Sequence, residues 1–337
     1  MNAVLKPAAV RPRIGFLGVG WIGRLRLQAL VADGSAEVAA IADPHLDSLQ
    51  IAAACAPGAR TGNCLEYLLD QRIDGVVIAT PSALHAEQVR SALQSGLAVF
   101  CQKPLTCTAD EAEAVIASAR GGNRLLAVDF SYRHVAGLRE LRDRIQSGEL
   151  GQLYAIDLVF HNAYGPDKPW FYEVNQSGGG CVMDLGSHLV DLALWSSGSD
   201  GFAAVDARLY GQGHRLEPPY TSAEDYATIQ ATLAEGTSVR MSCSWRLPAG
   251  RDALIEAAFY GTRGGAALRN VAGSFYDFRV DRYNGTQSEC LARPPDAWGG
   301  RALVQWAQRV RAGEGFDAAE AAHLLKVAQT MDRIYAR

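Results

Sequence analysis

The sequence of 337 residues has no long apolar run. None of its apolar stretches approaches the roughly 18 consecutive residues that a membrane-spanning helix needs. Blocks of basic residues are also missing, and 32 Lys and Arg against 36 Asp and Glu leave a net charge of −4. That balance argues against a nucleic-acid partner. The N-terminal MNAVLKPAAVRPR lacks the apolar core of a signal peptide. We therefore expect a soluble cytoplasmic protein with no membrane partner.

Paired cysteine motifs are missing as well. The seven cysteines are scattered, with no CxxC, at positions 55, 64, 101, 107, 181, 243 and 290. Such usage is typical of a reducing compartment. A structural zinc site needs ligand pairs two to four residues apart, so we expect no metal site. The 48% apolar and 20% charged content is that of an ordinary globular protein.

The first 130 residues alternate strand-like and helix-like runs. The strand-like runs are RIGFLGVG, EVAAIAD, DGVVIAT, LAVFCQ and RLLAVDF, and periodic apolar segments lie between them. Thr108 followed by Glu111 forms a capping box at the start of one helix. This alternation predicts a doubly wound parallel sheet, a Rossmann dinucleotide-binding domain over residues 1–131.

From residue 132 the pattern changes. A helix is expected over residues 132–151, then a strand, then a glycine-rich loop with a second helix over GGGCVMDLGSHLVDLALW. Strand-like runs with short turns such as EGT and TRGG follow, and two helices end the chain. We predict an α+β domain over 132–337, with an open, mainly antiparallel sheet for substrate binding and oligomerisation, whose last helix packs back on the first domain.

The first βα turn carries a glycine frame. GVGWIG places Gly18, Gly20 and Gly23 in a G-x-G-x-x-G pattern that follows a strand and opens a helix. The frame allows a tight turn, close approach of a pyrophosphate, and anion binding at the helix N-terminus. Trp21 and Ile22, inside the frame, are expected to contact the same cofactor. The alternative is a purely structural turn.

Asp43 ends the second strand, 20 residues beyond Gly23. A carboxylate there is expected to accept hydrogen bonds from the adenosine ribose hydroxyls. It would repel a 2′-phosphate, and Pro44 and His45 offer no arginine to hold one. NAD is therefore the expected cofactor, with NADP as the alternative.

ATPSALH, residues 79–85, follows another strand at the edge where doubly wound sheets bind ligands. Thr80, Pro81 and Ser82 are expected to reach the cofactor there, unless Pro81 and Ser82 only start a helix. His85, one turn into that helix, is a further cofactor-binding candidate, with a structural role as the alternative.

Asp184, His188 and Asp191 stand at i, i+4 and i+7 of one predicted helix, so they are expected to share a face. Three interpretations remain open. The face is solvated, or it ligates a divalent metal ion, or Asp184 orients His188 for proton exchange with a substrate. Asp191 is expected to be structural.

The loop before that helix, YGPDKPWFYE, carries aromatic residues that are candidates for a substrate pocket. Tyr164 and Trp170 are predicted to bind substrate, and Tyr172 is a third candidate; ordinary loop packing is the alternative. Arg133 is also predicted to contact substrate, against the alternative of a surface arginine at a helix start.

Five segments in this order resemble the Gfo/Idh/MocA oxidoreductases over nearly the whole chain: GVGWIG, ATPSALH, CQKPLT, RIQSGELGQLYAID and GGGCVMDLGSHLVDL. The family pattern has Glu-Lys-Pro at the third segment and Asp-x-x-x-His at the fifth. The resemblance implies that Lys103 is catalytic, with Asp184 and His188 as its partners across an interdomain cleft. Two departures bear on cofactor affinity and pose. Gln102 replaces the family glutamate, and Ser82 replaces the common asparagine.

The resemblance also implies hydride transfer between a nicotinamide cofactor and a secondary alcohol of a sugar, cyclitol or related polyol. Gln102 and Lys103 are then expected at the cofactor, and homodimers or homotetramers are expected to pack through the open sheet. Two alternatives stay open. Some relatives use a retained NAD for glycoside hydrolysis, and others bind cofactor as sensors or regulators without turnover.

Overall fold

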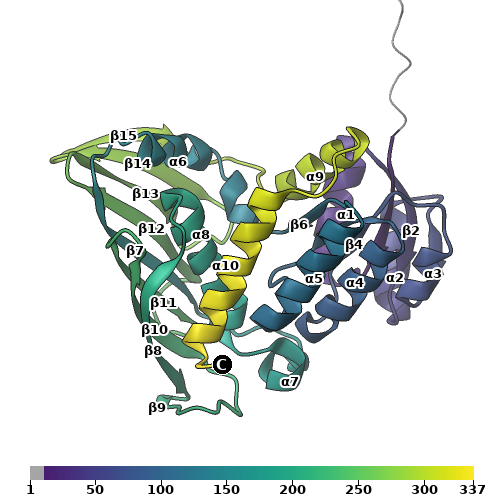
Figure 1. Ribbon diagram of the computed structural model, residues 1–337, viewed down its shortest axis with the longest axis horizontal. Coiled ribbons are helices and arrows are strands. Elements are labelled where there is room, and N and C mark those ends of the chain that lie inside the picture. Colours follow the sequence, from purple (N-terminus) through teal and green to yellow (C-terminus); the bar gives the residue numbers. More distant parts are fainter. Residues whose placement is uncertain (1–10) are drawn as a thin grey trace, which may run out of the picture.

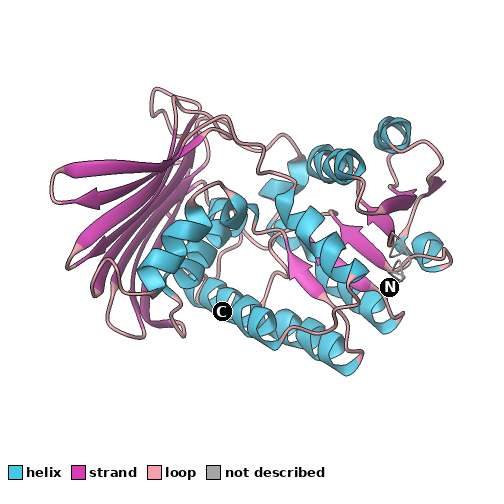
Figure 2. Cartoon of the chain, turned by 90° about the horizontal axis from the view of Figure 1, so that it is seen from above, coloured by secondary structure: helices cyan, strands magenta, loops and turns pink. Residues whose placement is uncertain are grey.

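A computed structural model describes residues 11–337 as two sheets with helices around and between them (Figures 1 and 2). The prediction about a signal peptide falls mostly on residues 1–10, which lie outside the described part of the chain. No helix within 11–337 is long and apolar enough to cross a bilayer.

The first sheet has six parallel strands in the order β3-β2-β1-β4-β5-β6. They are β1 Arg13–Leu17, β2 Glu37–Ala42, β3 Arg60–Gly62, β4 Gly75–Ile78, β5 Ala98–Cys101 and β6 Leu126–Val128. Every residue of β4 and β5 is buried, as expected for parallel strands covered on both faces. The predicted doubly wound fold is confirmed.

Helices connect these strands: α1 Trp21–Asp33, α2 Leu46–Cys55, α3 Leu65–Leu69, α4 His85–Gln94 and α5 Ala109–Gly121. The capping box at the start of α5 is present, since Thr108 Oγ1 accepts from the Glu111 amide and Glu111 Oε2 accepts from the Thr108 amide. Strand β3 and helix α3 escaped prediction because both are short and β3 is largely exposed.

The second sheet has nine strands in the order β15-β14-β13-β12-β7-β11-β10-β8-β9. They are β7 Leu153–Asn162, β8 Phe202–Gly211, β9 His214–Arg215, β10 Tyr226–Leu233, β11 Ser238–Ser244, β12 Ala253–Gly261, β13 Gly264–Asn270, β14 Phe278–Asn284 and β15 Gln287–Ala292. Only the β7–β11 pair is parallel, so the predicted, mainly antiparallel sheet is confirmed.

Helices cover one face of this second sheet, and its other face carries none of the described helices (Figure 2). The covering helices include α6 Leu138–Gln146 and α8 Ser187–Ser197; the short α7 Val174–Ser177 lies in the loop before α8. A single helix over 132–151 is a wrong prediction. Gly137 adopts a left-handed φ of 78°, so a 3₁₀ turn over Ser131–His134 is separated from α6.

The last two helices tie the sheets together. Helix α9, Arg301–Arg311, packs on α1 and β5, and α10, Ala318–Ile334, runs between α5 and α8 (Figure 1). Trp306 of α9 is 1% exposed, and its ring lies 5.8 Å from that of Phe100 in β5. The division of the chain at residue 131 stays a prediction, with the two sheets on either side of it.

Trp306→Ala is expected to lower the free energy of unfolding by about 3–5 kcal/mol, because a large ring is removed from the core between α9 and β5. Urea unfolding followed by circular dichroism measures the change. Val31→Ala, on the exposed side of α1, is the control and is expected to change stability by no more than about 0.5 kcal/mol. A change near the control value for Trp306→Ala would contradict the packing described.

Candidate active site

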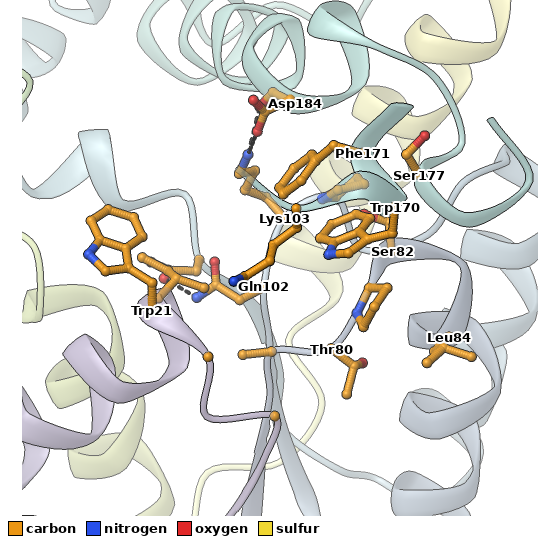
Figure 3. A pocket seen from close by; sticks show the side chains of 18 of the residues that line it. Trp21, Thr80, Ser82, Leu84, Gln102, Lys103, Trp170, Phe171, Ser177 and Asp184 are labelled. Atoms are coloured by element: carbon orange, nitrogen blue, oxygen red, sulfur yellow. Dashed lines mark hydrogen bonds and ion pairs between the residues drawn. The ribbon is translucent and has the colours of Figure 1, made fainter. Parts of the chain in front are cut away.

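A cavity of about 1390 Å³ lies at the carboxyl ends of the parallel strands, facing the second sheet and its loops (Figure 3). Most of the residues predicted for the site line it: Gly18, Gly20, Trp21, Ile22, Asp43, Thr80, Pro81, Ser82, Gln102, Lys103, Trp170, Asp184 and His188. Four predicted site residues lie outside the lining: Gly23, His85, Arg133 and Tyr164. Chain segments far apart in sequence therefore meet around one cavity.

The glycine frame shapes the cavity wall at the end of β1. Gly18 has a φ of 81°, and a Cβ there would lie 2.6 Å from the Ala79 carbonyl oxygen. A Cβ on Gly23 would lie 2.2 Å from the Gly18 oxygen, so Gly23 permits the tight turn without facing the cavity. A Cβ on Gly20 would meet nothing within 4 Å. The backbone at Gly20 is thus open to a ligand, as a pyrophosphate requires.

Asp43 is buried at the end of β2 and braces this turn. Its Oδ2 accepts from the Val19 amide and its Oδ1 from the His45 amide, each at 2.8 Å. The carboxylate also lines the cavity. Each oxygen has a second lone pair, so the residue fits the expected contact with ribose hydroxyls, which stays a prediction.

His85 is placed differently from the prediction that it binds cofactor. It is 1% exposed, and its Nδ1 and Nε2 lie 2.7 and 2.9 Å from the carbonyl oxygens of Pro104 and Thr80. Both ring nitrogens are therefore engaged, and the imidazole ties the loop after β4 to the loop after β5. Ser82, which starts a 3₁₀ turn, and Thr80 remain at the cavity.

Lys103 bridges the two sides of the cavity. Its Nζ donates to Asp184 Oδ1 at 2.6 Å and to the Asp184 carbonyl at 2.7 Å, and Figure 3 shows the pair joined by a dashed line. Trp245 Nε1 donates to Asp184 Oδ2 at 3.0 Å. Both carboxylate oxygens are thus taken, and the prediction that Asp184 orients the His188 ring is wrong. Asp184 orients Lys103.

A π-helical turn over Val182–Gly186 precedes α8 and carries Asp184. Because the π-helix closes with i→i+5 bonds, the spacing of side chains differs from that of an α-helix. Asp184 and His188 both line the cavity, whereas Asp191 does not. Of the three residues predicted to share a face, only Asp184 and His188 therefore reach the cavity.

His188 is buried among aromatic rings, with the edge of Tyr132 at a centroid distance of 4.9 Å. Its ring nitrogens have no hydrogen-bond partner within residues 11–337, and the residue lines the cavity. Burial, and next the positive charge of Lys103, lower the pKa of His188 well below its usual value of 6.5. The imidazole is neutral at pH 7 and is able to accept a proton.

Arg133 and Asp191 form a separate ion cluster behind the cavity. Arg133 Nε donates to both Asp191 oxygens at 3.1 and 3.0 Å, and its Nη1 lies 3.1 Å from Glu320 Oε1. His323 Nε2 lies 2.8 Å from Asp191 Oδ1. Arg133 is thus held between α8 and α10, outside the cavity lining, and its role in substrate binding stays a prediction. Asp191 has the structural place expected of it.

The metal alternative for the Asp184–His188–Asp191 segment has no support within residues 11–337. No group of three or more His, Cys, Asp or Glu side chains there is arranged to hold a metal ion. Asp184 and Asp191 instead bind Lys103 and Arg133.

Of the three candidates in the aromatic loop, only Trp170 lines the cavity. Trp170 lines the cavity and stacks on Phe171 at 3.8 Å between ring centroids; Figure 3 shows Trp170 and Trp21 on opposite sides of Lys103. Tyr164 is 58% exposed, donates to Asp252 Oδ1 at 2.6 Å and lies outside the lining, so its contact with substrate stays a prediction. Tyr172 donates to the Pro166 carbonyl and also lies outside the lining.

Two buried, charged residues of the lining, Arg26 and Asp129, were not predicted from the sequence. Arg26 Nε and Gln102 Nε2 both donate to Asp129 Oδ2, each at 2.5 Å. Asp129 follows a strand directly in RLLAVDF, which is a signal that sequence reasoning could have used. Arg26 offers no such signal, because Arg24 lies in the same helix and the sequence does not show which of the two arginines faces the cavity.

Comparisons with known proteins agree over most of the chain. A family model described as "Oxidoreductase family, NAD-binding Rossmann fold" matches residues 12–130, and one for the GFO/IDH/MocA C-terminal domain matches 138–267. The rhizopine catabolism protein MocA of Rhizobium meliloti is 30% identical over 263 residues, 77% of this chain and 78% of that protein. Inositol 2-dehydrogenase of Rhizobium meliloti (strain 1021) is 28% identical over 77% of this chain and 76% of that protein.

A solved structure of levoglucosan dehydrogenase with NADH and L-sorbose has the same fold. Its TM-score is 0.83 at 20% identity, covering 96% of this chain and 95% of the other.

The neutral state of His188 has a measurable consequence. Its pKa is lowered on folding from 6.5, so below about pH 6.5 the unfolded chain binds a proton that the folded protein does not. Wild-type stability is therefore expected to fall relative to His188→Gln as pH drops from 7.5 to 5.5, approaching about 1.4 kcal/mol per pH unit. Urea unfolding at several pH values measures this. The exposed His214→Gln is the control and should keep the wild-type slope; parallel curves for wild type and His188→Gln would contradict the assignment.

Proposed function

The chain belongs to the Gfo/Idh/MocA family of NAD-binding oxidoreductases, and on that premise we propose that it transfers a hydride between NAD and a secondary alcohol of a sugar, cyclitol or related polyol. One observation carries the proposal. The amine of Lys103 and the neutral imidazole of His188 line the same cavity as the glycine turn.

A nicotinamide bound in this cavity supplies the hydride acceptor. His188 receives the hydroxyl proton of the substrate, since its ring nitrogens are free of protein partners within residues 11–337 and its lowered pKa keeps it unprotonated. Lys103 donates a hydrogen bond to the reacting oxygen and stabilises developing alkoxide character. Asp184 positions that amine from the opposite side of the cavity.

Binding roles follow from the lining. The open backbone at Gly20 receives the pyrophosphate, and Asp43 receives the adenosine ribose and favours NAD over NADP. Trp170 offers an aromatic face to the apolar side of a sugar ring. Two relatives support this substrate class, because inositol 2-dehydrogenase and the D-glucoside 3-dehydrogenase of Escherichia coli act on a cyclitol and a glucoside.

Lys103→Ala and His188→Ala are each expected to cut turnover by about 10²–10⁴, because general acid–base assistance or oxyanion stabilisation is lost. The assay follows NADH formation with a panel of sugars, cyclitols and sugar acids, with NADP run in parallel. Lys326→Ala, which removes a lysine paired with Asp200 outside the cavity, is the control and should keep wild-type rates.

The panel also separates the alternatives. Wild-type rates in both variants with the true substrate would rule out this mechanism. Cleavage of glycosides without net NADH would indicate an NAD-dependent glycoside hydrolase. Cofactor binding without turnover would indicate a sensor or regulator. The Lys103–Asp184–His188 set favours the dehydrogenase over the sensor.

Self-association through the uncovered face of the second sheet is a further part of the proposal. That face carries half-exposed aromatic and polar side chains, including Tyr210, Tyr226 and Tyr260, in place of covering helices. We place the enzyme in the cytoplasm, consistent with seven free cysteines.

Light scattering is expected to give the mass of a dimer or tetramer. Thr228→Arg, in the middle of the face on β10, is expected to shift the protein toward monomer, because it places an unpaired charge in the interface. Gln94→Arg on the exposed side of α4 is the matched control and should keep the wild-type mass. A wild-type monomer, or an unchanged mass for Thr228→Arg, would count against this interface.

A further inference from the structure

Arg26, Gln102 and Asp129 form a buried polar group on the cavity wall that the proposed reaction does not use. The three come from α1 and from the ends of β5 and β6, and all line the cavity. Asp129 is 1% exposed and Arg26 is 7% exposed. Their contact is an ion pair of 2.5 Å between Arg26 Nε and Asp129 Oδ2.

The two oxygens of Asp129 are unequal. Oδ2 accepts from both Arg26 and Gln102, whereas Oδ1 is buried and has no hydrogen-bond partner. An unpartnered buried carboxylate oxygen costs about 1–3 kcal/mol or more, and such atoms are few in folded proteins. Asp129 lines the cavity although Oδ1 itself is covered, so a turn of the side chain would bring Oδ1 to a donor on a bound ligand.

Arg26 leaves donors free beside that acceptor. Its Nε is used by Asp129, and its two η nitrogens have no partner within residues 11–337. The side chain is 9% exposed and lines the cavity. Arg26 lines the same cavity as His188, and its charge also contributes to the lowered pKa of that imidazole. The wall therefore offers an N–H donor next to an orphaned acceptor.

We propose that the Arg26–Asp129 pair recognises a primary carboxamide, that of the nicotinamide, with Asp129 Oδ1 accepting from the amide N–H and an Arg26 η nitrogen donating to the carbonyl oxygen. A carboxamide presents one donor and one acceptor side by side, which matches the pair. This inference rests on the proposed function, since it takes NAD as the ligand.

Sheet order supports the assignment. Asp43 follows β2 and the glycine turn follows β1, whereas Gln102 and Asp129 follow β5 and β6. A dinucleotide with its ribose at Asp43 and its pyrophosphate at Gly20 extends toward the β5 side. The carboxamide of its far end is the amide available to Asp129.

Gln102 now has a physical role. Its amide N–H donates to Asp129 Oδ2 at 2.5 Å, where a glutamate would set two carboxylates against each other. The carboxylate that the family carries at position 102 is thus supplied here from position 129. Gln102→Glu alone is expected to weaken cofactor binding, and the double variant Gln102→Glu with Asp129→Asn is expected to regain part of it.

The test compares three dinucleotides by isothermal titration calorimetry: NAD, its 3-acetylpyridine analogue, which lacks the amide N–H, and nicotinic acid adenine dinucleotide, which carries a carboxylate instead. Wild type is expected to bind NAD about 10- to 100-fold tighter than the acetylpyridine analogue, the value of a hydrogen bond to a charged group. Nicotinic acid adenine dinucleotide should bind more weakly than NAD because Asp129 repels it.

Asp129→Asn turns its oxygen toward Arg26 and Gln102 and leaves an N–H at the former Oδ1. NAD affinity should fall to that of the acetylpyridine analogue, and affinity for nicotinic acid adenine dinucleotide should rise. This gain distinguishes the variant from a merely misfolded protein. The exposed Asp143→Asn on α6 is the matched control and should keep the wild-type order.

Equal wild-type affinities for NAD and the acetylpyridine analogue would overturn the inference while leaving the proposed function intact. So would an Asp129→Asn variant that weakens all three dinucleotides alike. A wild-type protein that binds none of them would overturn the proposed function and this inference together.

Discussion

The ion pair between Lys103 and Asp184 is the contact on which the arrangement of the cavity depends. Lys103 follows β5 of the parallel sheet, and Asp184 lies on the π-helical turn before α8. Both side chains are less than one fifth exposed, at 18% and 17%, so solvent screens their attraction only partly. Trp245 donates to the other carboxylate oxygen of Asp184. The carboxylate is thereby fixed, and it holds the Lys103 amine in one position.

This pairing also decides the state of His188. Asp184 is committed to Lys103 and Trp245 and makes no hydrogen bond to His188. Burial and the nearby ammonium of Lys103 lower the pKa of His188, and they outweigh the opposite effect of the Asp191 carboxylate. The imidazole stays neutral and faces the cavity. A second cation–carboxylate pair, Arg26 with Asp129, lies on the same wall and adds to this effect through the charge of Arg26.

The correct predictions were those in which a local pattern has one physical reason. Parallel strands buried on both faces have to be apolar throughout, as in β4 and β5, and a capping box satisfies helix donors wherever it occurs. Arg133, His85 and Tyr164, which were predicted for the site, lie outside the cavity lining. Arg133 and Tyr164 found partners outside the cavity, in Asp191 and Asp252. Both ring nitrogens of His85 are taken by the carbonyl groups of Pro104 and Thr80.

The sequence by itself determined the doubly wound sheet, the glycine turn and the pair Asp184 and His188, because steric and periodic constraints act over neighbouring residues. The candidate Lys103 came from the resemblance of CQKPLT to a family pattern. The tertiary structure alone decided which polar groups pair. Lys103 and Asp184 are 81 residues apart, and Arg26 and Asp129 are 103 apart. A buried charge pairs with whichever partner the packing brings within hydrogen-bond distance. A pattern along the sequence does not show which residues will lie that close together.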